Sequence, residues 1–175
     1  MVKIACLFAF GTEEIEGLTP VDVLRRSGAV CDIIGVGAKE VIGSHNITIK
    51  ADKTLEEVDF SSYDGIVIPG GMPGATNIAK EEKIISAIKD FIAKGKLVAS
   101  ICASPAVVLA QNRLVDNRKL TCYPADEFID SIKKHCEYYD FDVLVDNNLI
   151  TANGPKSAMQ FSVEIVKALS LPIKI

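Results

Sequence analysis

The chain has 175 residues, of which 49% are hydrophobic and 24% charged, and its formal net charge is −4. This length and composition predict one domain over residues 1–175, able to bury roughly 70% of its unfolded surface without a disulfide or metal. The negative net charge and the lack of a Lys/Arg block argue against nucleic acid or an anionic membrane as a partner.

Predicted strands and helices alternate along the chain. The strand runs are continuously apolar rather than alternating, which indicates a mainly parallel sheet buried by helices on both faces. The expected strands are 3–8, 30–36, 65–69, 97–101 and 148–152. The expected helices are 20–27, 81–94, 105–111, 125–134 and 155–169. This pattern predicts an α/β domain with a mainly parallel sheet and helices on both of its faces.

Three local patterns refine this order. Thr19 and Pro20 are typical of an N-cap and a first helical position, so residues 11–17 are expected to form a turn or a strained first turn of helix. The segment 40–51 contains two β-branched runs and predicts a small hairpin added to the sheet edge. Residues 138–145 are expected to form another short edge pair.

The first residues of the chain and its cysteine content together predict the cellular compartment of the protein. The apolar run at the N-terminus is too short for a membrane span and is followed by acidic residues rather than a cleavage site. Five cysteines without a CxxC motif, in a chain lacking an export signal, predict free thiols in the reducing cytoplasm.

Cys102 lies at the most informative junction, in the sequence KLVASICASPAVVLA. A buried strand precedes it, and Pro105 suits the first turn of the helix that follows. A sulfur at such a turn lies near the free N–H groups of a helix N-terminus, which favour the thiolate. The arrangement matches a nucleophile elbow with sulfur in place of oxygen.

Other polar groups follow the neighbouring strands, and a flavodoxin-like order brings them into one crevice with Cys102. The N–H groups of Gly71 and Ala103 are candidates for binding an oxyanion. The alternative is that the glycines after the strand 65–69 only form a tight turn. A buried, protonated carboxyl could donate a hydrogen bond to the sulfur. The local sequence does not choose among Glu13, Glu14 and Glu16, although a solvated helix start suits the first two.

Several other sites are not favoured by the sequence. The glycine turn lacks the Gly-Lys-Ser/Thr of a phosphate loop, and IIGVGAKE lacks the third glycine of a dinucleotide fingerprint. His45 lies at the predicted hairpin tip and His135 at the end of a polar helix, so both are expected at the surface. Cys122, His135 and Cys136 lack the spacing of zinc ligands. Cys6 and Cys31 are expected in the core.

Four segments of the chain resemble a known family. They are GTEEIEGLTPVDVLRRSG, YDGIVIPGGMPGATN, LVASICASPAVVLA and ITANGPKSAMQFSVEIVKAL. Together they resemble the ThiJ/PfpI superfamily, and more narrowly its Parkinson disease protein deglycase-like branch. The similarity runs over nearly the whole chain and keeps the order of the motifs.

This resemblance implies a flavodoxin-like three-layer α/β/α sandwich with a mainly parallel sheet, like that of the class I glutamine amidotransferases. It also implies a homodimer packed partly through the first helix. It places the reactive cysteine at Cys102, the protonated glutamate that hydrogen-bonds its sulfur at Glu16, and the oxyanion donors at Gly71 and Ala103. Arg25 and Arg26 match an arginine pair close to the dimer contact. Gly70, Tyr123, Gly154 and Pro155 are secondary site residues.

The chain also departs from the family pattern. Tyr123 stands where related proteins carry a histidine, and Lys156-Ser157 replaces the usual Gly-Thr of the last motif. Ala103 stands where protease members have a histidine, so peptidase activity is not expected. The His-x-Glu of the class I glutaminases is missing.

Two functions follow as hypotheses, and neither needs a cofactor or metal. The first is glyoxalase III or deglycase-type activity on small reactive carbonyl compounds, with Cys102 as nucleophile and Glu16 as proton shuttle. The second is a non-catalytic oxidative-stress sensor or redox-regulated chaperone that uses the same thiol. The remaining alternative is an inert buried cysteine in a generic α/β domain.

Overall fold

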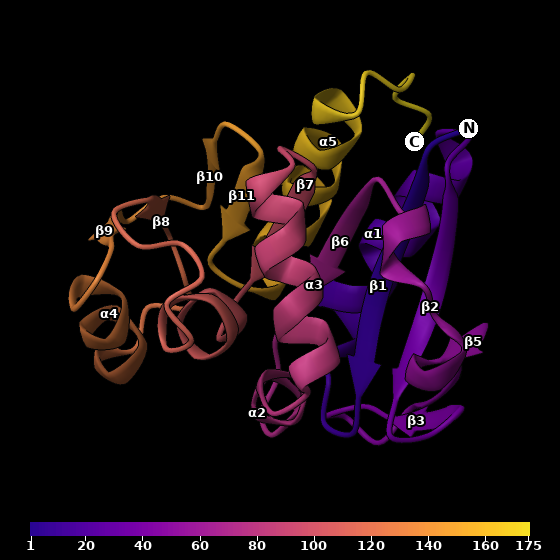
Figure 1. Ribbon diagram of the computed structural model, residues 1–175, viewed down its shortest axis with the longest axis horizontal. Helices are drawn as coiled ribbons and strands as arrows, with labels where there is room; N and C mark the ends of the chain where they lie inside the picture. The colour runs from indigo at the N-terminus through magenta and orange to yellow at the C-terminus, as the bar shows by residue number, and fades with distance from the viewer.

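A computed structural model describes residues 1–175 (Figure 1). A seven-stranded sheet forms the centre, in the order β10-β11-β7-β6-β1-β2-β5, and only the β10–β11 pair is antiparallel. Its strands are β1 (Lys3–Ala9), β2 (Val30–Val36), β5 (Lys53–Thr54), β6 (Gly65–Ile68), β7 (Leu97–Ile101), β10 (Val143–Asp146) and β11 (Leu149–Ala152). The predicted flavodoxin-like sandwich is confirmed, and β1, β6 and β7 lie side by side as expected.

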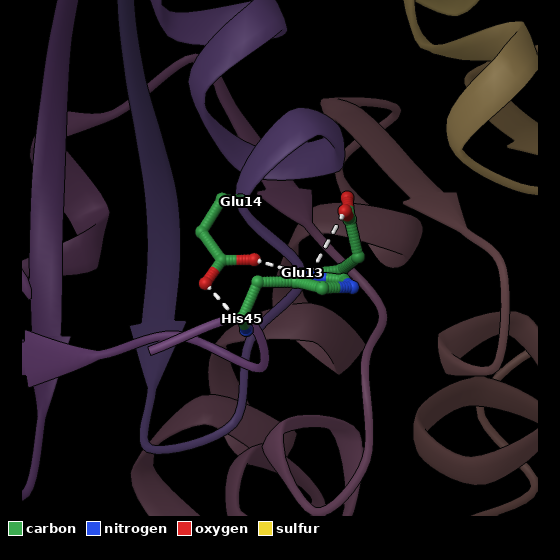
Figure 2. Close-up of side chains that lie close together, drawn as sticks. All are labelled: Glu13, Glu14 and His45. Carbon is green, nitrogen blue, oxygen red and sulfur yellow. Dashed lines mark hydrogen bonds and ion pairs between the residues drawn. The ribbon is translucent and has the colours of Figure 1, made fainter. Parts of the chain in front are cut away.

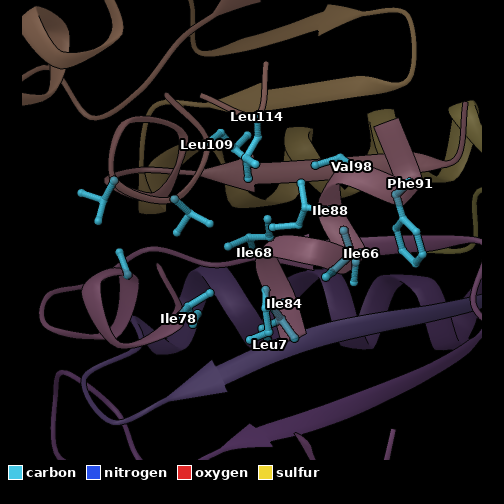
Figure 3. Close-up of a cluster of buried hydrophobic side chains, with 14 of the residues drawn as sticks. Leu7, Ile66, Ile68, Ile78, Ile84, Ile88, Phe91, Val98, Leu109 and Leu114 are labelled. Carbon is cyan, nitrogen blue, oxygen red and sulfur yellow. The ribbon is translucent and has the colours of Figure 1, made fainter. Parts of the chain in front are cut away.

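Helices cover both faces of this sheet. One face packs against α1 (Glu14–Arg26) and α5 (Ala158–Ala168), and the other against α2 (Gly74–Ala79), α3 (Glu82–Ala93), the π-helix η3 (Pro105–Ala110) and α4 (Asp126–Lys133). Figure 3 shows the second of these two cores, where Leu7, Ile66 and Ile68 of the sheet meet Ile84 and Ile88 of α3. Burial on both faces explains why the central strands are continuously apolar. No helix is both long and apolar enough to span a bilayer.

The first helix begins earlier than its proline suggested. α1 starts at Glu14 and contains Pro20 in its interior, because the Glu13 side chain caps the helix by accepting from the Glu16 amide at 2.8 Å. A carboxylate at an N-cap accepts a hydrogen bond from a free N–H group. The positive end of the helix dipole also stabilises its negative charge. The prediction of a helix over 20–27 was therefore wrong at its start. The extra turn carries Glu16.

Two small elements lie apart from the central sheet. β3 (Glu40–Ile42) and β4 (Thr48–Lys50) form the predicted hairpin, but as a separate two-stranded sheet rather than an addition to the edge. Residues 138–145 do not pair with one another, because β9 (Glu137–Tyr138) pairs with β8 (Lys119–Leu120) while β10 joins β11. Short 3₁₀ turns complete the chain at η1 (Leu55–Glu57), η2 (Phe60–Ser62) and η4 (Pro155–Ser157).

Candidate active site

Cys102 sits in a strained turn at the carboxyl end of β7. Its φ of 66° lies in the left-handed region, which residues other than glycine rarely adopt. The turn is held on both sides, since the Cys102 amide donates to Ala152 O at 2.9 Å and its carbonyl accepts from the Tyr123 amide at 2.8 Å. The residue is partly exposed rather than fully buried. Strain of this kind is typical of a functional position held by the surrounding fold.

The helix after Cys102 is anchored to the neighbouring strand. Ser104 Oγ donates to Pro69 O at 2.6 Å, immediately after β6. The following helix η3 is a π-helix, with the Gln111 amide donating to Ala106 O at 3.0 Å. Such helices are rare and concentrate at functional sites. The predicted strand-to-helix elbow is present, although its helix has a wider turn than the sequence indicated.

Glu16 faces the sulfur from the first turn of α1. Its side chain is fully buried, and Oε2 accepts from the Gly70 amide at 2.8 Å. Oε1 is buried without a hydrogen-bond partner, while the carboxyl interacts with the Cys102 side chain. A buried carboxyl oxygen that lacks a donor is best satisfied by a proton of its own, which it can direct to the sulfur.

Glycine at position 70 makes this approach possible. A Cβ at Gly70 would lie 2.6 Å from both Cys102 Cβ and Glu16 Oε2. Carbon and oxygen atoms cannot come so close, so any side chain here would separate the thiol from the carboxyl. The glycine turn after β6 therefore lets a backbone amide reach Glu16 between the two reactive groups.

Burial shifts both groups toward their protonated forms. Desolvation raises the pKa of Glu16 to about 7, with a further contribution from the Glu13 charge. Desolvation and the Glu16 charge also raise the pKa of Cys102, while the backbone N–H groups of Gly71 and Ala103 lower it. The sequence argument counted the helix end and a protonated carboxyl as favouring the thiolate, whereas burial and the Glu16 charge raise the pKa of Cys102. We treat the two groups as one coupled pair that exchanges a proton.

The backbone N–H groups of Gly71 and Ala103 lie close enough to Cys102 to lower the pKa of its thiol. Gly71 has a φ of 85°, and a Cβ there would lie 2.4 Å from the Glu13 amide nitrogen, so only glycine fits this turn. Two N–H groups that converge on a nucleophile can also bind an oxygen on the carbon it attacks. Their position agrees with the predicted role as oxyanion donors, which stays a prediction.

The raised pKa of Glu16 has a consequence for stability. The folded protein holds this proton up to about pH 7, whereas the unfolded chain releases it near the ordinary glutamate pKa of 4.5. The free energy of unfolding should therefore fall as the pH rises from 4.5 to 7, by about 3 kcal/mol at most. Glu16→Gln should remove this fall, as measured by urea unfolding at pH 5 and pH 8. Glu127→Gln, which alters an exposed side chain of α4, is the control. If the free energy of unfolding changes with pH in the same way in the wild type and in Glu16→Gln, the assignment is wrong.

Glu13 and Glu14 are not the solvated acids that the sequence suggested. Their exposed fractions are 7% and 4%, because the β3–β4 hairpin covers the start of α1. Glu14 accepts from the His45 amide at 2.7 Å and lies 2.9 Å from His45 Nδ1 (Figure 2). His45 keeps an exposed side chain, as expected for a hairpin tip, but it also fixes the helix start that presents Glu16.

This acidic cluster also offers ligand atoms for a metal. One atom each of Glu13, Glu14 and His45 lie within 4.8 Å of one another. Although burial raises the pKa of Glu14, its hydrogen bonds from His45 hold that pKa below the ordinary value. The bond to Glu14 correspondingly raises the pKa of His45. The cluster thus satisfies its own charges through hydrogen bonds.

The remaining predicted residues fall into two groups. Tyr123, Gly154 and Pro155 line a cavity next to Cys102, with the Tyr123 ring packed over Gly154. Arg26 ends α1, about 15 Å along the helix axis from Glu16, and pairs with Asp22 at 2.9 Å. It is thus not part of the cysteine site, and its place at a dimer contact stays a prediction. Cys6 and Cys31 are core residues as expected, and burial raises the pKa of Cys31 to about 12.

Comparison with known sequences gives one family. The sequence model of the DJ-1/PfpI family matches residues 2–168. Protein DJ-1 homolog B of Arabidopsis thaliana is 38% identical over 91% of this chain, but the chain spans only 36% of that protein's length. The Parkinson disease protein 7 homolog of Danio rerio is 32% identical over 93% of this chain and 87% of its own length. The glutathione-independent glyoxalase DJR-1.2 of Caenorhabditis elegans is 32% identical over 93% of this chain and 85% of its own.

Solved structures give the same result for the fold. Oxidized Toxoplasma gondii DJ-1 superposes with a TM-score of 0.90 at 36% identity, over 97% of this chain and 91% of that chain. Drosophila melanogaster DJ-1beta superposes with a TM-score of 0.90 at 31% identity, over 96% of this chain and 90% of that chain. The three-layer architecture around Cys102 is therefore the one found in these proteins.

Proposed function

Because the chain belongs to the DJ-1/PfpI family, we propose that it converts small reactive dicarbonyl compounds to hydroxy acids without a cofactor. The activity is of the glyoxalase III or deglycase type, with methylglyoxal and early glycation adducts as substrates. One observation carries the proposal: the buried Glu16 carboxyl, with Oε1 unpartnered, faces the accessible thiol of Cys102. The name of the glyoxalase relative from Caenorhabditis elegans supports this chemistry.

The first step forms a carbon–sulfur bond. Glu16 accepts the thiol proton while the Cys102 sulfur attacks the aldehyde carbon, so that the aldehyde oxygen becomes an alkoxide. The N–H groups of Gly71 and Ala103 stabilise this oxygen, and the proton passes from Glu16 to it. The product is a hemithioacetal, and Glu16 is again a carboxylate.

The second step moves one proton between carbon atoms. Glu16 removes the proton from the former aldehyde carbon and returns it to the neighbouring carbon, and the hemithioacetal hydroxyl proton passes to the former ketone oxygen, which converts the hemithioacetal to a thioester of lactate. Water then hydrolyses the thioester and restores the thiol. Methylglyoxal and water together give lactate, so the overall reaction needs no external oxidant or reductant. A carboxyl whose pKa lies near 7 suits both directions of transfer.

The direct test follows methylglyoxal with purified protein in a buffer free of metals and amines. We expect enzyme-dependent loss of methylglyoxal and equimolar lactate, identified by chromatography against both lactate enantiomers. A single enantiomer would indicate proton return within the site, since reaction in bulk buffer gives a racemate. Loss of methylglyoxal without lactate would contradict the proposal.

A second function is favoured by the exposure of the same sulfur. Cys6, Cys31 and Cys122 are buried, and Cys136 donates its thiol to Val115 O at 3.3 Å. Cys102 is thus the accessible thiol that has a carboxyl beside it, and the relative from Toxoplasma gondii has been described in an oxidized form. Peroxide would convert it to a sulfenate and then a sulfinate, with loss of catalysis.

Mass spectrometry tests this sensor function. One equivalent of peroxide should add oxygen to the peptide that contains Cys102 and leave the four other cysteines unmodified. Equal oxidation of Cys136 would argue against a dedicated sensor. A chaperone role for the oxidized form would require, in addition, that oxidation changes suppression of aggregation of a client protein.

We also propose that the protein forms a homodimer through α1. Ile15 and Leu18 on this helix are 54% and 36% exposed, so α1 presents apolar side chains that a second copy of the chain would cover. Arg25 and Arg26 at the end of the same helix are the charged residues expected near such a contact.

A further inference from the structure

The first turn of α1, which carries Glu16, is weakly tied to the rest of its helix. Pro20 lies inside α1 and has no N–H group, so the helical hydrogen bond that would end on the Glu16 carbonyl is missing. The proline ring also crowds that carbonyl, because the two lie one helical turn apart. The position of the Glu16 carboxyl therefore depends on contacts outside the helix.

Some of these contacts join the turn to the glycine turn after β6. The Glu13 amide donates to Gly70 O at 3.0 Å, and the Gly70 amide donates to Glu16 Oε2 at 2.8 Å. The Glu13 carboxylate in turn accepts from the Glu16 amide. These bonds connect the beginning of α1 to the centre of the sheet.

The tip of the β3–β4 hairpin holds the same turn through Glu14 (Figure 2). The His45 amide donates to Glu14 Oε1 at 2.7 Å, and His45 Nδ1 lies 2.9 Å from Glu14 Oε2. The Ser44 hydroxyl donates to Glu14 Oε2 at 3.3 Å, and the Ser44 amide donates to Thr12 O at 2.9 Å. Both oxygens of the Glu14 carboxylate therefore bind the hairpin.

The hairpin has the shape that this contact needs. A Cβ at Gly43 would lie 2.2 Å from Glu14 Oε1, so only glycine lets the carboxylate reach the hairpin backbone. Asn46 closes the tip with a φ of 60°, and its amide donates to Gly43 O at 3.1 Å. Glu14 is buried, whereas the His45 side chain is 70% exposed. His45 can therefore be replaced without opening the core.

We propose that Glu14 and His45 are positioning residues for the proton transfer and act through Glu16. The hairpin holds the first turn of α1 in the place where the Glu16 carboxyl meets both the Gly70 amide and the Cys102 side chain. In this role neither positioning residue contacts the substrate or carries the proton. The inference rests on the proposed carbonyl chemistry at Cys102 and adds the element that keeps its proton carrier in place.

The kinetics of His45→Ala measure this role. Without the imidazole, the turn should hold Glu16 less firmly, so kcat for methylglyoxal should fall about tenfold while KM stays within about twofold. His45→Asn places an amide nitrogen where Nδ1 stood, so it can donate to Glu14 and should recover much of the loss. His135→Ala removes the other histidine, which follows α4, and should keep the wild-type kcat.

A double-variant cycle shows whether His45 acts through Glu16. In the Glu16→Gln background, His45→Ala should cause no further loss of kcat, because no proton carrier is left to position. A changed dimer contact or a general loosening of the fold would instead lower the rate in both backgrounds. An equal loss in both backgrounds would overturn the proposal.

Hydrogen exchange, followed by NMR, measures the position of the turn without catalysis. The Gly70 amide is the reporter, because it donates to the Glu16 carboxyl. Glu14→Gln and His45→Ala should each speed its exchange about three- to tenfold. The Leu24 amide, on the part of α1 after the proline, should exchange as it does in the wild type.

The two measurements separate this proposal from the proposed function. Faster exchange of the Gly70 amide in both variants of a protein that does not consume methylglyoxal would overturn the proposed function and leave the positioning of Glu16 standing. Turnover of methylglyoxal with kcat unchanged in Glu14→Gln and His45→Ala would overturn the positioning role alone, whether or not the exchange becomes faster.

Discussion

Cys102→Ser should reduce methylglyoxal consumption to the rate of the buffer, a loss of about 10³-fold or more. The serine hydroxyl would occupy the same strained turn and face the same carboxyl, so the geometry of the site should be kept. A hydroxyl is far harder to ionise than a thiol, and a carboxyl with a pKa of about 7 cannot remove its proton efficiently. The measurement is the initial rate of methylglyoxal loss together with lactate formation.

Cys136→Ser is the matched control for this variant. Cys136 is partly exposed like Cys102, but its thiol donates to Val115 O, and nothing places it near Glu16. The control should keep the wild-type rate. If Cys102→Ser consumes methylglyoxal as fast as the wild type does, the nucleophile has been assigned wrongly and the proposed function fails with it.

Glu16→Gln should lower kcat by a factor of about 10² to 10⁴, the usual contribution of a positioned general acid–base. Glutamine has nearly the same shape, and its side-chain oxygen can still accept from the Gly70 amide. It cannot exchange a proton with the sulfur or with the substrate carbons. Its effect therefore separates proton transfer from packing.

The pH profile gives the second readout for this variant. The reactive form of the pair has one proton on the thiol and none on Glu16, so acid protonates the carboxyl and stops the first step. Because burial raises the pKa of Glu16 to about 7, wild-type kcat/KM should rise with pH around a midpoint near 7. Glu16→Gln should lose this limb of the profile. A midpoint near 7 that persists in Glu16→Gln would assign the titration to another group.

Catalysis and oxidation compete for the same sulfur in this arrangement. A carboxyl that hydrogen-bonds a thiol can also hydrogen-bond a sulfinate, and the Gly71 and Ala103 amides can bind its oxygens. Oxidation would then end turnover without unfolding the protein. The two proposed functions are consistent with each other, and the peroxide and methylglyoxal experiments measure them independently.

The sequence predicted the sheet and its reactive turn because both depend on local patterns. Continuous apolar runs located the five main strands, and the alternation with helices gave the parallel order. Cys102 was found because a cysteine stands between a buried strand and a helix that begins with proline. The hairpin at residues 40–51 was also predicted, but not its position over α1.

The sequence could not decide among three nearby acids by itself. Glu13, Glu14 and Glu16 have the same chemistry, and Pro20 disguised the start of α1. The folded chain gives each a different partner: Glu13 caps the helix, Glu14 binds His45 of the hairpin, and Glu16 turns inward to Gly70. Each role depends on a contact with a residue that is remote in sequence or on the true start of the helix.

Residue type and order alone determined the flavodoxin-like framework and the thiol at its strand end, since hydrophobic periodicity and the proline after the turn are local properties. Tertiary structure decided the protonation of the pair. Desolvation depends on every atom packed around Glu16 and Cys102, and it outweighs the nearby N–H groups that had suggested a free thiolate. It also brought Asp142, which precedes β10, to within 3.0 Å of Lys156 in η4, a contact between residues on either side of the β10–β11 pair.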